Sequence, residues 1–160
     1  MKELKIESIF QVYEDINELP NDVSLLMNKA IEARTKAYAP YSRFKVGAAI
    51  LLDNGEIVTG NNQENVSFPS GLCAERTAIY YAGAQYPNSK ILKMAITAAS
   101  SNHKTDNPIP PCGACRQAIA EYEVKQHFPI EIYFMGEVGD IMKSNSLSNL
   151  LPLLFDKTAL

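Results

Sequence analysis

The sequence predicts one α/β domain, a three-layer sandwich in which a mixed central sheet of about five strands has helices on both faces. Segments with strand and helix periodicity alternate along the chain in the order β-α-β-β-α-β-α-β-α. The 160 residues, 46% of them hydrophobic, suit a single domain that stays folded without disulfides. No internal repeat, linker or low-complexity tract divides the chain.

The first half of the chain predicts a strand, a helix and a hairpin. Residues 3–13 alternate apolar and polar side chains, which favours a half-buried strand. Apolar residues recur at helical spacing over about 21–36. Two short strands, 46–52 and 56–60, flank Asp53-Asn54-Gly55, and Asn-Gly supplies the positive φ angles of a tight hairpin turn.

The second half alternates helices and strands. The alanine-rich segment 73–84 has no helix breaker and predicts a helix, and 91–99 is typical of a buried strand. A second helix is predicted over 113–124, a strand over 130–135 and a short helix over 146–151. Both segments that contain cysteine begin helices, so we expect the starts of these helices to meet at one edge of the sheet.

Charge and hydropathy exclude several classes of function. Fifteen Lys and Arg against 18 Asp and Glu give a net charge of -3, and no basic block offers a path for a nucleic-acid backbone. The N-terminus lacks the apolar core of a signal peptide, and the longest apolar run, 46–52, is far shorter than the ~20 residues of a membrane-spanning helix. We therefore expect a cytoplasmic protein with neither nucleic acid nor membrane as a partner.

The three cysteines fall in two clusters, Cys73-Ala-Glu-Arg76 and Pro111-Cys-Gly-Ala-Cys-Arg116, each at a predicted helix start. An odd number of cysteines without an export signal favours metal binding or catalysis over disulfides. A helix N-terminus lowers the pKa of a thiol, and C-x-x-C spacing lets two sulfurs reach one ion. Three thiolates on a tetrahedral Zn²⁺ leave one position open, as in catalytic zinc sites.

Other readings of these residues stay open at this point. The C-x-x-C pair alone also fits a redox pair or half of a structural zinc site. His103 and His127 have no ligand spacing to the cysteines. Glu75, two residues after Cys73, points to another side of the helix, where it would handle protons close to the ion. Cys-Ala-Glu followed by Pro-Cys-Gly-Ala-Cys matches the signature of the zinc deaminases.

The chain resembles the cytidine deaminases of pyrimidine salvage. Four blocks carry the resemblance in family order: Tyr38–Ala49, Gly60–Asn65, Cys73–Ile79 and Pro111–Gln117. The resemblance covers about residues 20–155. It implies a catalytic domain over 21–160, with residues 1–20 as an N-terminal extension. It also implies hydrolytic deamination of cytidine and 2'-deoxycytidine to uridine and 2'-deoxyuridine, with release of ammonia.

The resemblance implies one Zn²⁺ per subunit, with Cys73, Cys112 and Cys115 as its ligands. Water activated on the metal would attack C4 of the pyrimidine, and Glu75 would carry protons from this water to N3 and to the leaving amine. Arg76 would donate hydrogen bonds to the ligand sulfurs and temper their charge, although a solvated helix arginine fits the residues too. Arg116, which follows the last cysteine, is expected to be such a solvated arginine.

The nucleoside would be bound by residues outside the cysteine clusters. The resemblance implies that Asn62 and Glu64 bind the ribose hydroxyls, that Phe44 packs on the pyrimidine ring, and that Ala74 offers backbone groups to the base. From the residues alone, Asn62 and Glu64 would also fit a polar turn, and Phe44 would fit the core.

The resemblance further implies a homotetramer whose sites are completed by neighbouring subunits. Phe155 would reach the nucleoside of the next chain, or simply pack with the leucines around it. Phe68 stands where many relatives have tyrosine, so a hydroxyl contact in the shared site would be absent. Pro110 would present its carbonyl near the leaving amine. These two departures leave the fine substrate preference open.

Three other functions compete with this one. A polynucleotide-editing deaminase would need a positively charged path, which the net charge of -3 argues against. A deaminase of nucleotides or of an aminoacyl-nucleoside antibiotic is disfavoured because Asn62 and Glu64 suit a free ribose. A zinc-binding interaction module without catalysis would need a fourth ligand and would give Glu75 no task.

Overall fold

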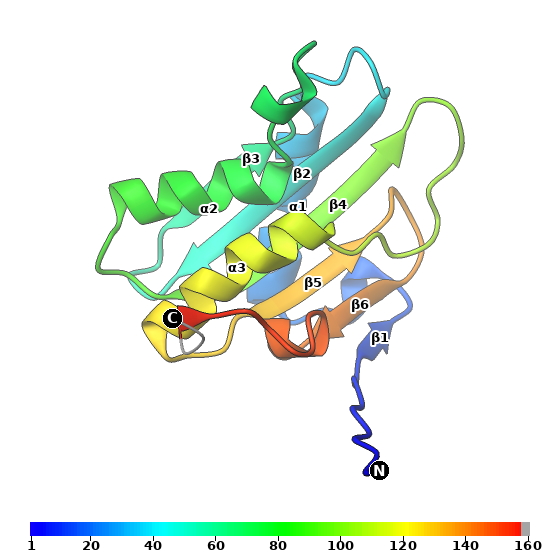
Figure 1. Cartoon of the computed structure of the whole chain (residues 1–160). Coiled ribbons are helices and arrows are strands. Elements are labelled where there is room, and N and C mark those ends of the chain that lie inside the picture. The colour runs from blue at the N-terminus through cyan, green and yellow to red at the C-terminus, as the bar shows by residue number, and fades with distance from the viewer. Residues whose placement is uncertain (158–160) are drawn as a thin grey trace.

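The computed structural model describes residues 1–157 and has one mixed sheet with helices on both faces (Figure 1). α1 (Asn21–Thr35) covers one face, while α2 (Ala74–Gln85) and α3 (Gly113–Gln126) cover the other. The strands are β1 (Gln11–Tyr13), β2 (Phe44–Leu52), β3 (Ile57–Asn61), β4 (Ile91–Ser100), β5 (Glu131–Met135) and β6 (Ile141–Ser144). The predicted three-layer α/β class is thus confirmed.

The six strands lie in the order β1-β6-β5-β4-β2-β3. β2 pairs antiparallel with both β3 and β4, and the predicted hairpin joins β2 to β3. β4 and β5 are parallel, so the chain needs a crossover between them, which α3 supplies. β5 and β1 both pair antiparallel with β6. The sequence predicted about five strands and missed β6, because four residues without alternation give no strand period.

The core lies in two layers, one on each face of the sheet. Between the sheet and the two helices α2 and α3, buried residues such as Ile50, Ile79 and Ile119 pack together. On the other face, Leu26 and Met27 of α1 pack against buried residues of the sheet. Successive residues of a strand point to opposite faces, so each buried strand serves both layers.

Two glycines allow the helices to approach the sheet closely. A Cβ at Gly47 of β2 would lie 2.0 Å from the carbonyl oxygen of Ala30 in α1. A Cβ at Gly60 of β3 would lie 2.6 Å from both the carbonyl oxygen of Ala74 and the amide nitrogen of Ala78 in α2. Gly60 therefore sets the position of the first turn of α2.

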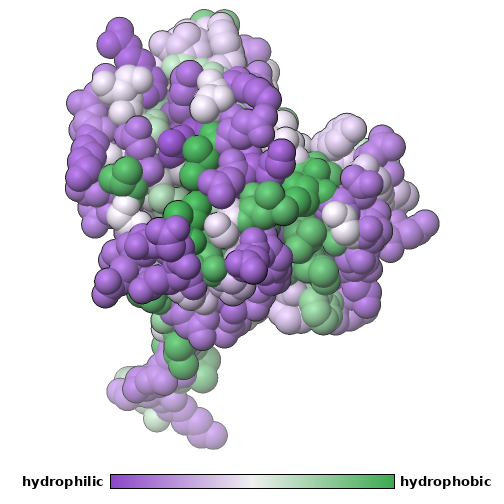
Figure 2. Space-filling model, turned by 180° about the vertical axis from the view of Figure 1, so that it is seen from behind, coloured by the Kyte–Doolittle hydropathy of each residue, from purple (hydrophilic) through white to green (hydrophobic). Residues whose placement is uncertain are grey.

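The two ends of the chain differ from the predicted elements. Of the strand predicted over 3–13, only Gln11–Tyr13 pairs with the sheet, because β6 is too short to pair with more. Residues 1–9 are exposed, and they project from the body at the bottom of Figure 1 and Figure 2. The helix predicted over 146–151 is one 3-10 turn, η3 (Leu147–Asn149).

The face that carries α1 is mainly hydrophilic, and its hydrophobic residues form separate patches, the largest at the right of the view (Figure 2). Within residues 1–157, none of the helices combines the length and the apolar character that crossing a bilayer requires.

Candidate metal and active site

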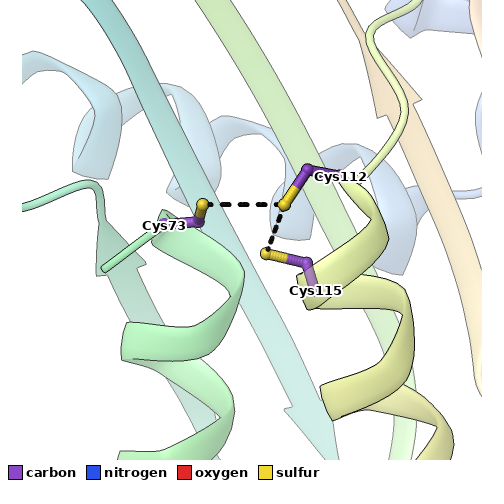
Figure 3. A group of neighbouring side chains, drawn as sticks. All are labelled: Cys73, Cys112 and Cys115. Atoms are coloured by element: carbon purple, nitrogen blue, oxygen red, sulfur yellow. Dashed lines mark hydrogen bonds between the residues drawn. The ribbon is translucent and has the colours of Figure 1, made fainter. Parts of the chain in front are cut away.

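The three cysteines converge from the starts of two helices (Figure 3). Cys73 and Cys112 directly precede α2 and α3 with extended backbones, and Cys115 lies in the first turn of α3. The Sγ atoms of Cys73 and Cys112 are 3.8 Å apart, and those of Cys112 and Cys115 are 3.5 Å apart. All three sulfurs lie within 4.8 Å of one another.

This arrangement fits a zinc ion. Zn–S bonds of about 2.3 Å at tetrahedral angles place sulfurs about 3.8 Å apart, close to the spacing of these three. Within residues 1–157, this is the one group of three or more metal-binding side chains whose ligand atoms meet. The donor set consists of three cysteine sulfurs, which as thiolates are ligands typical of protein zinc sites.

The surroundings of Cys73 favour its thiolate form. A hydrogen bond from the Cys115 thiol and the nearby Arg76, whose Nη2 lies 3.9 Å from the Cys73 sulfur, together outweigh burial and lower the pKa of Cys73 to about 5. The same hydrogen bond, together with burial, raises the pKa of Cys115. Since thiolate is the metal-binding form of cysteine, Cys73 is prepared for a metal at neutral pH.

Glu75 is the buried acid of the site. It is the second residue of α2, and only 4% of it is exposed. Burial, assisted by the negative charge of Cys73, raises the pKa of Glu75 from 4.5 to about 7. A carboxyl group with a pKa near neutrality both takes up and releases protons easily, as a general acid and base must.

A cleft of about 460 Å³ opens beside Cys73. It is lined by four further residues with predicted roles, namely Asn62, Glu64, Phe68 and Arg76. Other residues with predicted roles lie outside this lining: Glu75, Cys112 and Cys115, Phe44, which is half-buried at the start of β2, and Ala74, which is buried in α2. Phe155 lies on the exposed C-terminal segment and does not line the cleft of its own chain.

Asn62 contacts the start of β2, and Glu64 contacts the loop before it. The side-chain amide of Asn62 accepts a hydrogen bond through Oδ1 from the backbone amide of Val46 (2.8 Å) and donates one from Nδ2 to the Phe44 carbonyl (2.9 Å). Glu64 accepts hydrogen bonds from the amides of Tyr41 (2.9 Å) and Ser42 (3.2 Å) and from the Ser42 hydroxyl.

These contacts position the loop beside the cleft. Burial raises the pKa of Glu64, but its three donors outweigh burial and hold this pKa below its ordinary value. Glu64 is therefore a carboxylate that fixes the loop before Phe44. The sequence did not predict that Tyr41 and Ser42 donate hydrogen bonds to Glu64. These contacts join residues more than 20 positions apart and so leave no local pattern.

The two arginines of the cysteine clusters differ in their contacts. Besides its contact with Cys73, Arg76 has a buried Nε without a hydrogen-bond partner in the described chain. Arg116 was expected to be solvated, but its Nε donates to the Pro111 carbonyl (2.8 Å) and its Nη1 to the Leu150 carbonyl (2.9 Å). The proline-rich run before Cys112, which has few donors of its own, is the signal that would have pointed to this role.

Residues 20–130 match the family model described as the cytidine and deoxycytidylate deaminase zinc-binding region. The chain belongs to the cytidine and deoxycytidylate deaminase family. The predicted resemblance is thereby confirmed. The matched region contains all three cysteines and Glu75, and the cysteine cluster fits the zinc that the family model names.

Curated members of the cytidine deaminase family cover most of the chain. The cytidine deaminase of Halalkalibacterium halodurans is 40% identical over 134 residues, which are 84% of this chain and 94% of the relative. That of Sporosarcina psychrophila is 39% identical over 136 residues, 85% of this chain and 93% of the relative.

Solved structures of cytidine deaminases share the fold. The crystal structure of the enzyme from Burkholderia pseudomallei has a TM-score of 0.71 at 36% identity, covering 86% of this chain and 100% of that one. The structure from Mycobacterium tuberculosis has a TM-score of 0.66 at 33% identity, covering 86% and 99%.

Proposed function

We propose that this chain is a zinc-dependent cytidine deaminase of pyrimidine salvage. It hydrolyses cytidine and 2'-deoxycytidine to uridine and 2'-deoxyuridine and releases ammonia. The observation that carries the proposal is the buried carboxyl group of Glu75 beside three converging cysteine sulfurs. The curated relatives at 39% and 40% identity, which are named cytidine deaminases, support the same activity.

In this proposal, Cys73, Cys112 and Cys115 hold one zinc ion per subunit. Zinc, when bound, supplies a Lewis acid and an activated water at neutral pH. Glu75 takes a proton from the attacking water and delivers it to N3 of the pyrimidine. The same carboxyl group then takes the remaining proton of the hydroxyl group added at C4 and passes it to the amine, which leaves as ammonia while the C4 carbonyl of uridine forms. Its pKa of about 7 supports both directions of proton transfer.

The nucleoside occupies the cleft beside Cys73. Asn62 and Glu64 line this cleft, and the Oδ1 of Asn62 and the Oε1 of Glu64, which each accept one hydrogen bond, retain lone pairs for the ribose hydroxyls. Phe44 packs on the pyrimidine, and the backbone of Ala74 contacts the base. Arg76 donates to the sulfur of Cys73 and lowers the negative charge that three thiolates place on the metal.

The enzyme works in the cytoplasm as a homotetramer, with no nucleic acid as a partner. Phe68 and Phe155 contact the nucleoside of a neighbouring subunit. Their large apolar side chains are 77% and 63% exposed, which supports a role in contacts between chains. A net charge of -3 supports a small nucleoside over a polynucleotide.

The decisive experiment is the ultraviolet change when cytidine is added to the zinc-loaded protein. We expect wild type to consume cytidine and 2'-deoxycytidine but not cytidine monophosphate. Glu75→Gln should bind zinc without turnover, whereas Glu56→Gln, which changes an exposed glutamate of the hairpin turn, should behave as wild type. A zinc-loaded wild type that leaves both nucleosides unchanged would disprove the proposal and favour the antibiotic deaminase or the interaction module.

A further inference from the structure

Residues 108–111, which lead to Cys112, have few polar anchors. They belong to the loop over residues 101–112 that follows β4, and three of them, Pro108, Pro110 and Pro111, have no amide hydrogen to donate. In the part of the chain that the structure describes, residues 108–111 take part in one hydrogen bond, from Arg116 Nε to the Pro111 carbonyl. Cys112, the ligand that follows, is exposed. The side chain of Arg116 is thus the polar contact that the described chain offers to residues 108–111.

Arg116 also contacts the C-terminal segment that follows β6. Its Nη1 donates to the carbonyl of Leu150, directly after η3. The next residue, Gln117, donates from Nε2 to the carbonyl of Phe155 (3.0 Å). Farther along α3, the carboxylate of Glu123 accepts a hydrogen bond from the amide of Leu147 (2.9 Å). One side of α3 thus holds residues 147–155, which we call the C-terminal strap.

We infer that Arg116 is a positioning residue of the metal site. Its guanidinium joins the loop that ends at Cys112 to the C-terminal strap, so that the two move as one unit. Only a planar fork presents Nε and Nη1 to two carbonyls in a fixed geometry, which the ammonium group of lysine does not reproduce. The inference rests on the proposed function in one respect, namely that the three cysteines hold zinc.

The experiment compares four variants of the full chain loaded with zinc. Arg116→Met keeps the apolar length of the side chain and removes both donors, while Arg116→Lys keeps the charge without the fork. Gln117→Ala removes one contact of the strap without touching the loop. Glu123→Gln weakens the strap farther along the same helix. The readouts are the rate of zinc release to a chromophoric chelator and the visible spectrum of the Co²⁺-substituted protein, which reports ligand geometry.

We expect Arg116→Met to release zinc about 10- to 100-fold faster, in line with the loss of metal affinity that follows when the contacts behind a ligand are removed, and to shift the cobalt bands. The zinc release rate of Arg116→Lys should lie between those of Arg116→Met and wild type, and the other two variants should release zinc at the wild-type rate. Wild-type release and an unchanged cobalt spectrum in Arg116→Met would overturn the inference. Equal acceleration by Glu123→Gln would overturn it too, since general loosening would then explain the effect.

Two controls keep these outcomes separate. Thermal melting shows whether each variant is folded, and if Arg116→Met does not fold, the comparison of Arg116→Lys with wild type decides. Failure of the proposed function is distinguishable, because it would appear as a wild-type protein that binds no zinc or deaminates no nucleoside. Failure of the inference leaves the wild-type protein active and changes only the expected order of the variants.

Discussion

Replacing Gly60 by alanine tests how closely α2 must approach the sheet. The added Cβ would lie 2.6 Å from two backbone atoms of α2, the Ala74 oxygen and the Ala78 nitrogen. Ordinary contact begins at 3.4 Å, so the helix must move by about 0.8 Å. Because Ala74 lies between Cys73 and Glu75, this shift moves one sulfur and the buried acid relative to the cysteines of α3.

The expected cost follows from that displacement. The 3.8 Å between the sulfurs of Cys73 and Cys112 would change from the spacing that a tetrahedral zinc accepts. A misplacement of about 1 Å at reacting groups costs about 100-fold in rate, and overpacking costs about 1–3 kcal/mol of stability. We therefore expect kcat/KM for cytidine to fall by about 100-fold, with lower zinc content and a lower Tm.

Ultraviolet assays of cytidine loss, metal analysis and thermal melting measure the three effects. Gly113→Ala is the matched control, because a Cβ there meets nothing within 4 Å although the residue lies between Cys112 and Cys115. It should retain activity and zinc. If Gly60→Ala kept wild-type kcat/KM and zinc content, the close approach of α2 would not set the geometry of the site, and the reasoning would be refuted.

Three further predictions concern stability. The raised pKa of Glu75 means that ionisation of this carboxyl group opposes folding. In the metal-free protein, Glu75→Gln should therefore be more stable than wild type by about 3 kcal/mol above about pH 7, and this difference should disappear as the pH falls below 4.5. Thermal melting across pH measures the difference, and equal stability of the two proteins above pH 7 would contradict the prediction. His127 ends α3 at a φ of 50°, so His127→Gly should raise stability by about 0.5–1 kcal/mol in urea unfolding, and a loss would contradict this. Glu123→Gln should lower stability by about 1.5–3 kcal/mol without changing kcat/KM, since its carboxylate accepts from the amides of Ile130 and Leu147; an unchanged denaturation midpoint would show that these contacts add nothing.

Local patterns in the sequence predicted most of the fold. The three α-helices and the hairpin follow from periodicity and from Asn54-Gly55, signals that lie within a few residues. The alternation over 3–13 predicted a strand that forms only at its end, because alternation does not report whether a neighbouring strand is long enough to pair. β6 was missed because its own four residues show no alternation. Its extended conformation is instead stabilised by pairing with β5 and β1.

In the candidate site, too, local patterns predicted some of the residues and not others. Cys73, Glu75 and the Cys112-x-x-Cys115 pair were predicted from spacing at helix starts, and the structure brings their sulfurs together. The contacts of Arg116 with Leu150 and of Glu64 with Ser42 join segments far apart in the chain, and residue types alone do not predict them. Reasoning from sequence thus located the groups with distinctive chemistry but not the residues that hold the backbone around them.

The origin of the three sulfurs on separate segments orders metal capture relative to folding. Cys112 and Cys115 are neighbours even in an unfolded chain, whereas Cys73 lies 39 positions before Cys112 and meets it only after α2 and α3 have docked on the sheet. An ion that encounters the nascent chain therefore finds two sulfurs, and the third arrives with tertiary structure. Only molecules that have completed their fold would consequently retain the metal tightly. In a refolding experiment, tight binding of labelled metal would appear at the rate at which the two helices dock on the sheet.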